Sequence, residues 1–272
     1  MRFKIIALDL DGTALDSREA IRPRTKAAVA AALAQGVEVA LVTGRHHVAT
    51  RPYHLELGLK TPALCCNGAY VYDFVAEAAL AGDALSERQA RRLLQECRAS
   101  GVHAMIYTDQ AMTFERDNAH LRRLMAWAAT YPVAIRPDIR QVESFDRVIN
   151  EARVIWKFVV SHDDVGVLAE WHARMQDNPD VSAEYSWTNR LDIVRSGNSK
   201  GRRLVEWAGS RGVTPAEILA FGDNRNDLSM IEAAGLGVAM GNGDEAAKRA
   251  AVLVIGDNDS NALGEAIERY LS

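Results

Sequence analysis

The sequence predicts an α/β fold in which a parallel sheet forms the core and a separate α+β unit is inserted into it. Apolar runs at residues 5–8, 37–42 and 218–221 each stop at a polar or glycine-containing turn, which is typical of strands buried on both faces. Between the first two runs the apolar residues recur at helical intervals, and this strand, helix, strand alternation favours a parallel sheet. Residues 86–194 mix helical and extended patterns without that alternation.

Capping residues, prolines and glycines predict where the other core elements begin and end. Pro23 near a helix start and Gly36 just past its end bound the first helix, and Ser199 is placed to cap a later one. The other predicted core elements are strands at 63–66, 237–240 and 252–255 and helices at 199–211 and 227–234.

The middle of the chain begins with a helix that runs from a Ser86 and Gln89 capping box to about residue 100. Further strands are predicted at 102–108, 112–115 and 154–160, helices at 121–129 and 163–175, and a hairpin over 181–194. We therefore expect residues 1–82 and 191–272 to form the catalytic core and residues 83–190 to form the inserted domain.

The composition of the chain limits the classes of function and partner that it can have. The chain has 272 residues, 48% of them hydrophobic, and a formal net charge of −4, so it offers no basic stripe for nucleic acid. No signal peptide or membrane-length apolar run is present, and the three cysteines suit reduced thiols, so a cytoplasmic protein is expected. The expected partner is a small phosphorylated metabolite, and the expected state is a monomer or small homo-oligomer.

Polar residues end four of the predicted strands: Asp9, Thr43, Asn67 and Asp223. Because ligands of open parallel sheets bind beyond the carboxyl ends of the strands, these residues predict one polar site. Asp11 lies two positions beyond Asp9, which turns both side chains to the same side of an extended backbone.

The carboxylates suggest phosphoryl transfer. Asp9 can attack phosphorus as a nucleophile, and Asp11 can act as acid and then base. Mg²⁺ is needed to reduce the repulsion between Asp9 and a phosphate dianion, with Asp223 as the next carboxylate for the ion and Asp227 after it. Taken singly, each of these residues is as well explained by a turn or cap.

Neutral and positive groups complete the predicted site. Thr43 and the Gly44 amide can donate to phosphoryl oxygens, and Lys200, at a helix start, supplies a positive charge. A lone lysine is usually solvated, so the interpretation depends on where all of these residues fall together.

The chain resembles the haloacid dehalogenase-like phosphatases, in particular their Cof-type branch. The matching motifs span the chain: Asp9-Leu10-Asp11-Gly12-Thr13, Val42-Thr43-Gly44-Arg45, Lys200, and Gly222-Asp223 through Asn226-Asp227. The resemblance implies a Rossmann-like core with a C2-type cap, Asp9 as nucleophile and Asp11 as acid/base. It also implies Mg²⁺ on Asp9, the Asp11 backbone carbonyl and Asp223, with Asp227 in support, and phosphate held by the Leu10 amide, Thr43, Gly44, Lys200 and Asn226.

A narrower similarity, in Cys65-Cys66-Asn67-Gly68 and Trp156-Lys157-Phe158, is to the bacterial pyridoxal phosphate phosphatases of this branch. It implies pyridoxal 5'-phosphate as substrate, with side activity on sugar phosphates. Trp156, Tyr185 and Trp187 could stack on the pyridine ring or pack inside the cap. His46 and His47 are interpreted as solvated, with a substrate entrance as the alternative.

Two other functions use the same groups. A phospho-accepting signalling module would retain its phosphoryl group, whereas Asp11 and the large insertion favour hydrolysis in a shielded site. A phosphomutase would return the phosphoryl group to another hydroxyl of its substrate, and the motifs alone are compatible with that reaction.

Overall fold

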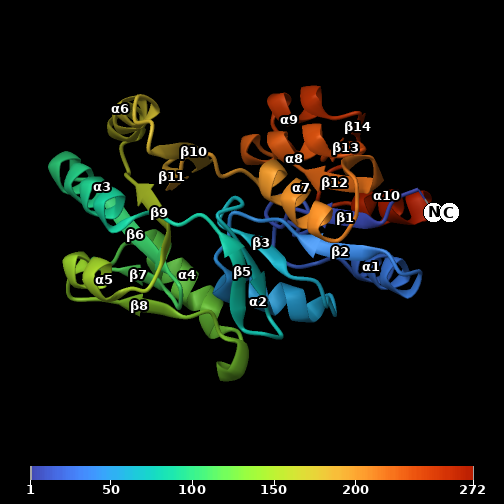
Figure 1. The fold of residues 1–272 in the computed structure, drawn as a ribbon, viewed down its shortest axis with the longest axis horizontal. Coiled ribbons are helices and arrows are strands. Elements are labelled where there is room, and N and C mark those ends of the chain that lie inside the picture. Colours follow the sequence, from blue (N-terminus) through green and yellow to red (C-terminus); the bar gives the residue numbers. More distant parts are fainter. Residues whose placement is uncertain (1, 272) are drawn as a thin grey trace. The chain divides into compact units, whose positions relative to one another are not determined.

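The computed structural model describes residues 2–271 and divides them into two compact units. Of these residues, unit 1 comprises 2–43, 53–81 and 199–271, and unit 2 comprises 44–52 and 82–198. Figure 1 shows both units in the colours of the sequence. Each unit is described separately below.

Unit 1 is built on a parallel five-stranded sheet in the order β14-β13-β12-β1-β2. The central strand β1 (Ile5–Leu8) is entirely buried, and it pairs with β2 (Glu38–Leu41) on one side and with β12 (Ile218–Gly222) on the other. The sheet continues through β13 (Leu236–Ala239) and β14 (Leu253–Val254). All five strands run in one direction, so their carboxyl ends meet at one edge of the sheet.

Helices cover the sheet of unit 1. On one face α7 (Lys200–Ser210) and α8 (Leu228–Ala233) pack over alternate strand residues in a buried apolar cluster. Two further helices, α1 (Pro23–Ala34) and α10 (Ala262–Leu271), pack along each other, as Figure 1 shows, and α1 contacts β2. The remaining helices are α2 (His47–Glu56), whose first residues belong to unit 2, and α9 (Glu245–Ala250).

A second, smaller sheet follows β2 in the chain. It consists of β3 (Ala63–Cys65), β4 (Tyr70–Asp73) and β5 (Ala78–Gly82), in that order. A parallel bridge between Val42 and Leu64 connects β3 to the end of β2, so the turn after β3 lies next to the carboxyl edge of the main sheet.

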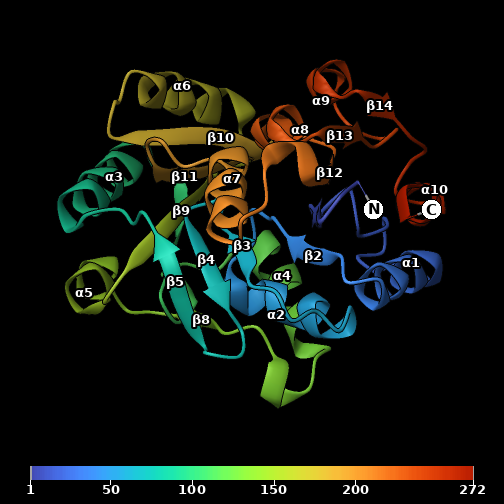
Figure 2. The same ribbon diagram turned by 45° about the vertical axis from the view of Figure 1, so that its right-hand side comes forward.

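Unit 2 is an α+β unit with a six-stranded sheet in the order β10-β11-β9-β6-β7-β8. Its main core joins that sheet to α3, α5 and α6, which Figure 2 shows from a second side. The strands are β6 (His103–Thr108), β7 (Met112–Phe114), β8 (Ile139–Gln141), β9 (Ile155–Ser161), β10 (Val181–Trp187) and β11 (Arg190–Arg195). The helices are α3 (Glu87–Ser100), α4 (Ala119–Ala129), α5 (Phe145–Glu151) and α6 (Val165–Gln176).

Most of the predicted elements are present with ends shifted by one or two residues. The predicted capping box of Ser86 and Gln89 begins α3, and Ser199 caps α7. The prediction that His46 and His47 are solvated is wrong, because both side chains are buried. The Nε2 atom of His46 lies 2.7 Å from the Thr108 carbonyl oxygen within unit 2. No helix within residues 2–271 combines the length and the apolar character needed to span a bilayer.

The aromatic residues of unit 2 differ in their surroundings. Trp156 is buried, and the Tyr185 ring packs edge-on against His172 with the ring centroids 4.7 Å apart. Trp187 is 67% exposed at the end of β10. Only Trp187, of these three, therefore presents most of its ring to solvent.

Candidate active site

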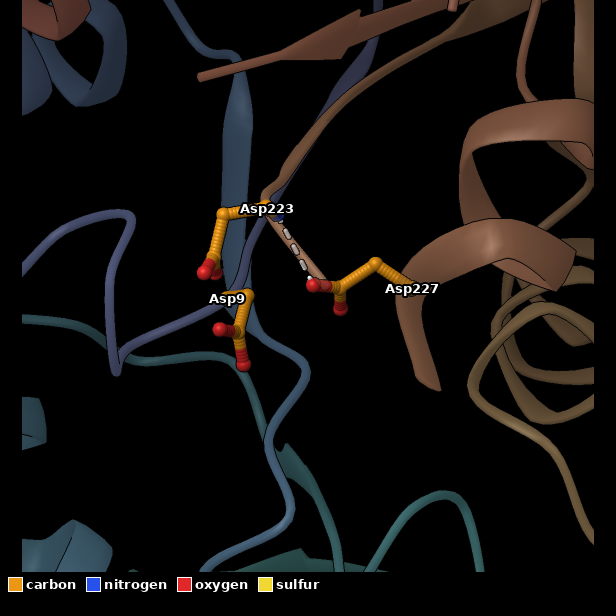
Figure 3. Close-up of side chains that lie close together, drawn as sticks. All are labelled: Asp9, Asp223 and Asp227. Atoms are coloured by element: carbon orange, nitrogen blue, oxygen red, sulfur yellow. Dashed lines mark hydrogen bonds between the residues drawn. The ribbon is translucent and has the colours of Figure 1, made fainter. Parts of the chain in front are cut away.

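Three carboxylates meet at the carboxyl edge of the main sheet. Asp9 directly follows β1 and Asp223 directly follows β12, and these two strands are neighbours in register. Asp227 joins them from the start of α8, and one ligand oxygen of each residue lies within 4.8 Å of the others. Figure 3 shows the three side chains converging from these elements. The structure therefore brings these three carboxylates together at one edge of the sheet.

Lys200 lies among these carboxylates. It is the first residue of α7 and follows Ser199, which caps the helix by accepting a hydrogen bond from the Arg202 amide. Its Nζ atom donates to Asp9 Oδ1 and to Asp227 Oδ1, both at 2.6 Å, and the side chain is completely buried. Burial lowers the pKa of Lys200, but the charges of Asp227 and Asp9 outweigh it and hold the pKa above its ordinary value.

Asp227 uses both of its oxygens inside the protein. While Oδ1 accepts from Lys200, Oδ2 accepts from the backbone amides of Asp223 at 3.0 Å and Asn224 at 3.1 Å. The first of these bonds is the dashed line in Figure 3. Such a carboxylate is suited to holding the loop after β12 in shape, because few of its lone pairs remain for another ligand.

The turn after Asp9 contacts Asp223 closely. Thr13 Oγ1 donates to Asp223 Oδ1 at 3.0 Å. Gly12 has a φ of 78°, and a Cβ atom at this position would lie 2.3 Å from Asp223 Oδ2. Thr13 and Gly12 belong to the first motif, which on its own predicts no role for either of them. Their function is visible only once the two distant segments are seen together.

The charge balance of the cluster favours a bound cation. Burial and the charge of Asp227 raise the pKa of Asp9 well above its ordinary value, and the same two causes raise the pKa of Asp223 to about 7. The single positive charge of Lys200 does not balance the three carboxylates, so negative charge remains uncompensated in this buried cluster. An all-oxygen donor set of carboxylates suits a hard divalent ion such as Mg²⁺, so the residues present fit that metal.

Asp11 and Leu10 occupy the remaining positions of the first motif. Asp11 is exposed, and its negative charge contributes to raising the pKa of both Asp9 and Asp223. Its side chain lies outside the group of three converging carboxylates found in residues 2–271. Leu10 is fully buried, and its carbonyl accepts from the amides of Thr13 and Leu15.

Thr43 and Asn226 both contact one residue, Asn67. Thr43, two residues beyond β2, is completely buried, and its carbonyl accepts from the Asn67 amide at 3.0 Å. Asn226 Nδ2 donates to Asn67 Oδ1 at 3.1 Å. The sequence predicts Asn67 at a strand end without an individual role, although a polar side chain directly after a buried strand indicates a functional position.

Gly44 is the first residue of the 44–52 segment and belongs to unit 2. Its carbonyl accepts a hydrogen bond of 2.7 Å from Lys157 Nζ, and that nitrogen also donates to Asp192 Oδ2 at 2.7 Å. The Lys157–Asp192 pair is buried, so it holds the Gly44 carbonyl with little competition from water.

Comparison with known proteins places this geometry in a family. Residues 6–267 match the haloacid dehalogenase-like hydrolase family. The chain is a haloacid dehalogenase-like hydrolase. Pyridoxal phosphate phosphatase YbhA of Escherichia coli strain K12 is 41% identical to this hydrolase over 271 residues, which cover 100% of both chains. The 5-amino-6-(5-phospho-D-ribitylamino)uracil phosphatase YwtE of Bacillus subtilis strain 168 is 25% identical over 99% of this chain and 98% of its own.

Solved structures agree with the family assignment. A haloacid dehalogenase-like hydrolase from Bacteroides thetaiotaomicron superposes with a TM-score of 0.85 at 26% identity, covering 98% of this chain and 99% of its own. These findings confirm the predicted α/β fold with its inserted domain, and they show that this haloacid dehalogenase-like hydrolase is a phosphatase.

Proposed function

We propose that this phosphatase hydrolyses phosphate monoesters through an aspartyl-phosphate intermediate, with Mg²⁺ as cofactor and pyridoxal 5'-phosphate as its main substrate. The observation that carries the chemistry is the buried contact of 2.6 Å between Lys200 and Asp9, beside Asp223. The identity of 41% to a pyridoxal phosphate phosphatase supports the substrate. Sugar phosphates are expected as secondary substrates.

The reaction divides into two displacements at phosphorus. In the first, an Asp9 carboxylate oxygen bonds to phosphorus while the bond from phosphorus to the ester oxygen breaks, and Asp11 gives a proton to the leaving alcohol. In the second, water attacks the aspartyl phosphate and passes a proton to Asp11, so that inorganic phosphate leaves and Asp9 is restored. Asp11 is suited to this exchange because its side chain is exposed beside Asp9.

Charge neutralisation makes the first step feasible. Lys200 fixes one Asp9 oxygen and offsets part of the negative charge that accumulates when a phosphate dianion approaches. Asp9, the Asp11 backbone carbonyl and Asp223 would hold Mg²⁺, with Asp227 supporting the site. When bound, the ion would supply further positive charge at the phosphoryl oxygens.

Neutral hydrogen-bond donors, together with the charged Lys200, would hold the transferring group. We assign the Leu10 amide, Thr43, the Gly44 amide, Lys200 and Asn226 to the phosphoryl oxygens. The inserted domain, which lies within residues 82–198 of unit 2, would select the alcohol part of a small phosphorylated metabolite, and unit 1 would carry the nucleophile and the metal-binding carboxylates. The exposed Trp187 ring of that domain offers an aromatic face on which a pyridine ring would stack.

The test is a comparison of kcat/KM for phosphate release over a panel of pyridoxal 5'-phosphate, hexose phosphates and nucleoside monophosphates. The wild-type protein should prefer pyridoxal 5'-phosphate and release pyridoxal and phosphate in equal amounts. The Asp9→Asn variant keeps the side-chain shape and should remain folded but release no phosphate. A clear preference for hexose phosphates would overturn the substrate, and near-normal turnover by Asp9→Asn would overturn the mechanism.

The same assay separates the two rival functions. A signalling module would accumulate a stable phosphoprotein, and a phosphomutase would need a bisphosphorylated activator and release little free phosphate. Steady release of phosphate without such an activator excludes both.

A further inference from the structure

The turn after β3 has an unusual backbone. Three consecutive residues, Cys66, Asn67 and Gly68, have positive φ angles of 51°, 55° and 81°. Side chains other than glycine rarely adopt this conformation, and asparagine adopts it more readily than most. Cys66 and Asn67 are also buried. Such a turn persists only where the surrounding structure holds it, and conformations of this kind cluster at functional sites.

Asn67 bridges two segments of the proposed phosphate site within unit 1. Its backbone amide donates to the Thr43 carbonyl at 3.0 Å, and its side-chain Oδ1 accepts from Asn226 Nδ2 at 3.1 Å. Thr43 lies two residues beyond the end of β2, whereas Asn226 lies in the loop after β12. A residue that does not itself hold phosphate in our proposal is therefore bonded to two that do.

The same turn is held against the start of α7. Gly68 lies so close to the Ser199 backbone that a Cβ atom on Gly68 would be 2.2 Å from the Ser199 carbonyl oxygen. The Gly68 carbonyl also accepts a hydrogen bond of 2.9 Å from Arg203 Nε. Ser199 immediately precedes Lys200. The turn is thus fixed to a third segment of the site, which limits how far Asn67 can move.

We propose that Asn67 is a positioning residue, which orients the Asn226 carboxamide for the phosphoryl group. An amide nitrogen carries two hydrogens, so one can bond to Asn67 while the other donates to a phosphoryl oxygen. The bond to Asn67 fixes the plane of the Asn226 carboxamide and the direction of that second hydrogen. This inference rests on the proposed function, because it assigns Asn226 to phosphate.

The Asn67→Gly variant separates the side chain from the backbone. Glycine adopts the positive φ without strain, so the turn should keep its backbone conformation, and the unfolding temperature should fall only by what the lost buried hydrogen bond accounts for. Loss of the carboxamide should lower kcat/KM by about 10- to 100-fold, the range expected for one hydrogen bond to a charged group, and weaken inhibition by inorganic phosphate similarly. Glu77→Gly is the matched control, because Glu77 has a φ of 50° in the exposed turn before β5.

A double-mutant cycle tests whether Asn67 acts through Asn226. If it does, the combination of Asn67→Gly with Asn226→Ala will be no worse than Asn226→Ala alone, a non-additivity that a merely structural role would not produce. Losses that multiply, or a wild-type kcat/KM for Asn67→Gly, would overturn the proposal. In either case an active wild-type protein with an inactive Asp9→Asn variant would leave the proposed function intact.

A second variant covers the case in which Asn67→Gly does not fold. Asn67→Asp tolerates a positive φ and keeps the oxygen that accepts from Asn226. In that background Asn226→Ala should still lower kcat/KM and weaken inhibition by phosphate. If Asn226→Ala has no effect there, although it does in the wild-type protein, the orienting hydrogen bond is not the means by which Asn67 acts.

Discussion

Lys200 Nζ lies 2.6 Å from Asp9 Oδ1, in a contact from which water is excluded. Removing one partner of a buried ion pair leaves a charge unpaired, so Lys200→Met should lower the free energy of unfolding by about 3–5 kcal/mol and abolish phosphate release. Urea unfolding in EDTA measures the first effect. Lys248→Met is the control, because its pair with Glu245 is solvated and should be worth under about 1 kcal/mol. Equal effects of the two substitutions would contradict the buried pairing.

Gly12 provides a test of close packing at the metal-binding residues. Gly12→Ala introduces a Cβ 2.3 Å from Asp223 Oδ2, which forces the carboxylate to move, so kcat should fall by about 100-fold or more. Gly36→Ala is a matched control: its φ of 80° is equally unfavourable to alanine, but its Cβ would meet no atom within 4 Å. The control should lose about 1 kcal/mol of stability and keep full activity. Equal activity of the two variants would refute the steric argument.

The acidic cluster predicts that divalent metal stabilises the protein. Chelation with EDTA should stop phosphate release, and Mg²⁺ should restore it and raise the unfolding free energy by about 2.7 kcal/mol at 100 times its dissociation constant. Asp223→Asn removes the negative charge of one metal ligand, so the variant should remain folded while losing most of that stabilisation. An unfolding temperature that does not depend on Mg²⁺ would contradict the site. Differential scanning fluorimetry measures each case.

His46 predicts a dependence of stability on pH. Burial lowers its pKa to about 4, with the nearby Lys157 acting in the same direction and the Thr108 hydrogen bond and Asp138 acting against it. The unfolded chain therefore takes up the proton first, so stability present above pH 6.5 falls as the pH drops towards 4, by about 3 kcal/mol. His47, whose pKa burial lowers to about 2, with His46 and Arg51 acting in the same direction, adds to the trend.

His46→Gln should make this pH dependence shallower. Denaturant unfolding at pH 7 and pH 4.5 measures the slope, and His162→Gln, at a partly exposed position just after β9, is the control. An unchanged slope in His46→Gln would show that the buried imidazole does not cause the effect.

Local signals predicted much of this molecule. The predicted apolar runs correspond to β1 and β12, which are followed by aspartates. Ser86 and Ser199 cap the starts of α3 and α7, as their side-chain chemistry predicts. The strand β5 was not predicted, since Ala78–Gly82 is exposed along its whole length and has no alternation of apolar and polar residues. β5 pairs with β4 because of contacts that exist only in the folded protein, and these contacts leave no periodic pattern in the sequence.

The supporting contacts of the site could not be predicted for a different reason. Thr13 and Asp223, or Asn67 and Asn226, meet across a large separation in sequence, and nothing local to either partner specifies the other. The buried histidines show the same limit. A polar side chain at a helix start is usually solvated, so the sequence predicts exposed His46 and His47, whereas both side chains are buried.

The position of β1 between β2 and β12 affects how the protein is made. One neighbour of this strand is synthesised early, but the other begins only at Ile218, after the whole inserted unit. During translation β1 therefore has an open, apolar edge, which is a template for pairing with other chains. Emerging chains should depend on chaperones until the ribosome has passed β12, and truncation before Ile218 should yield aggregates rather than a smaller folded core.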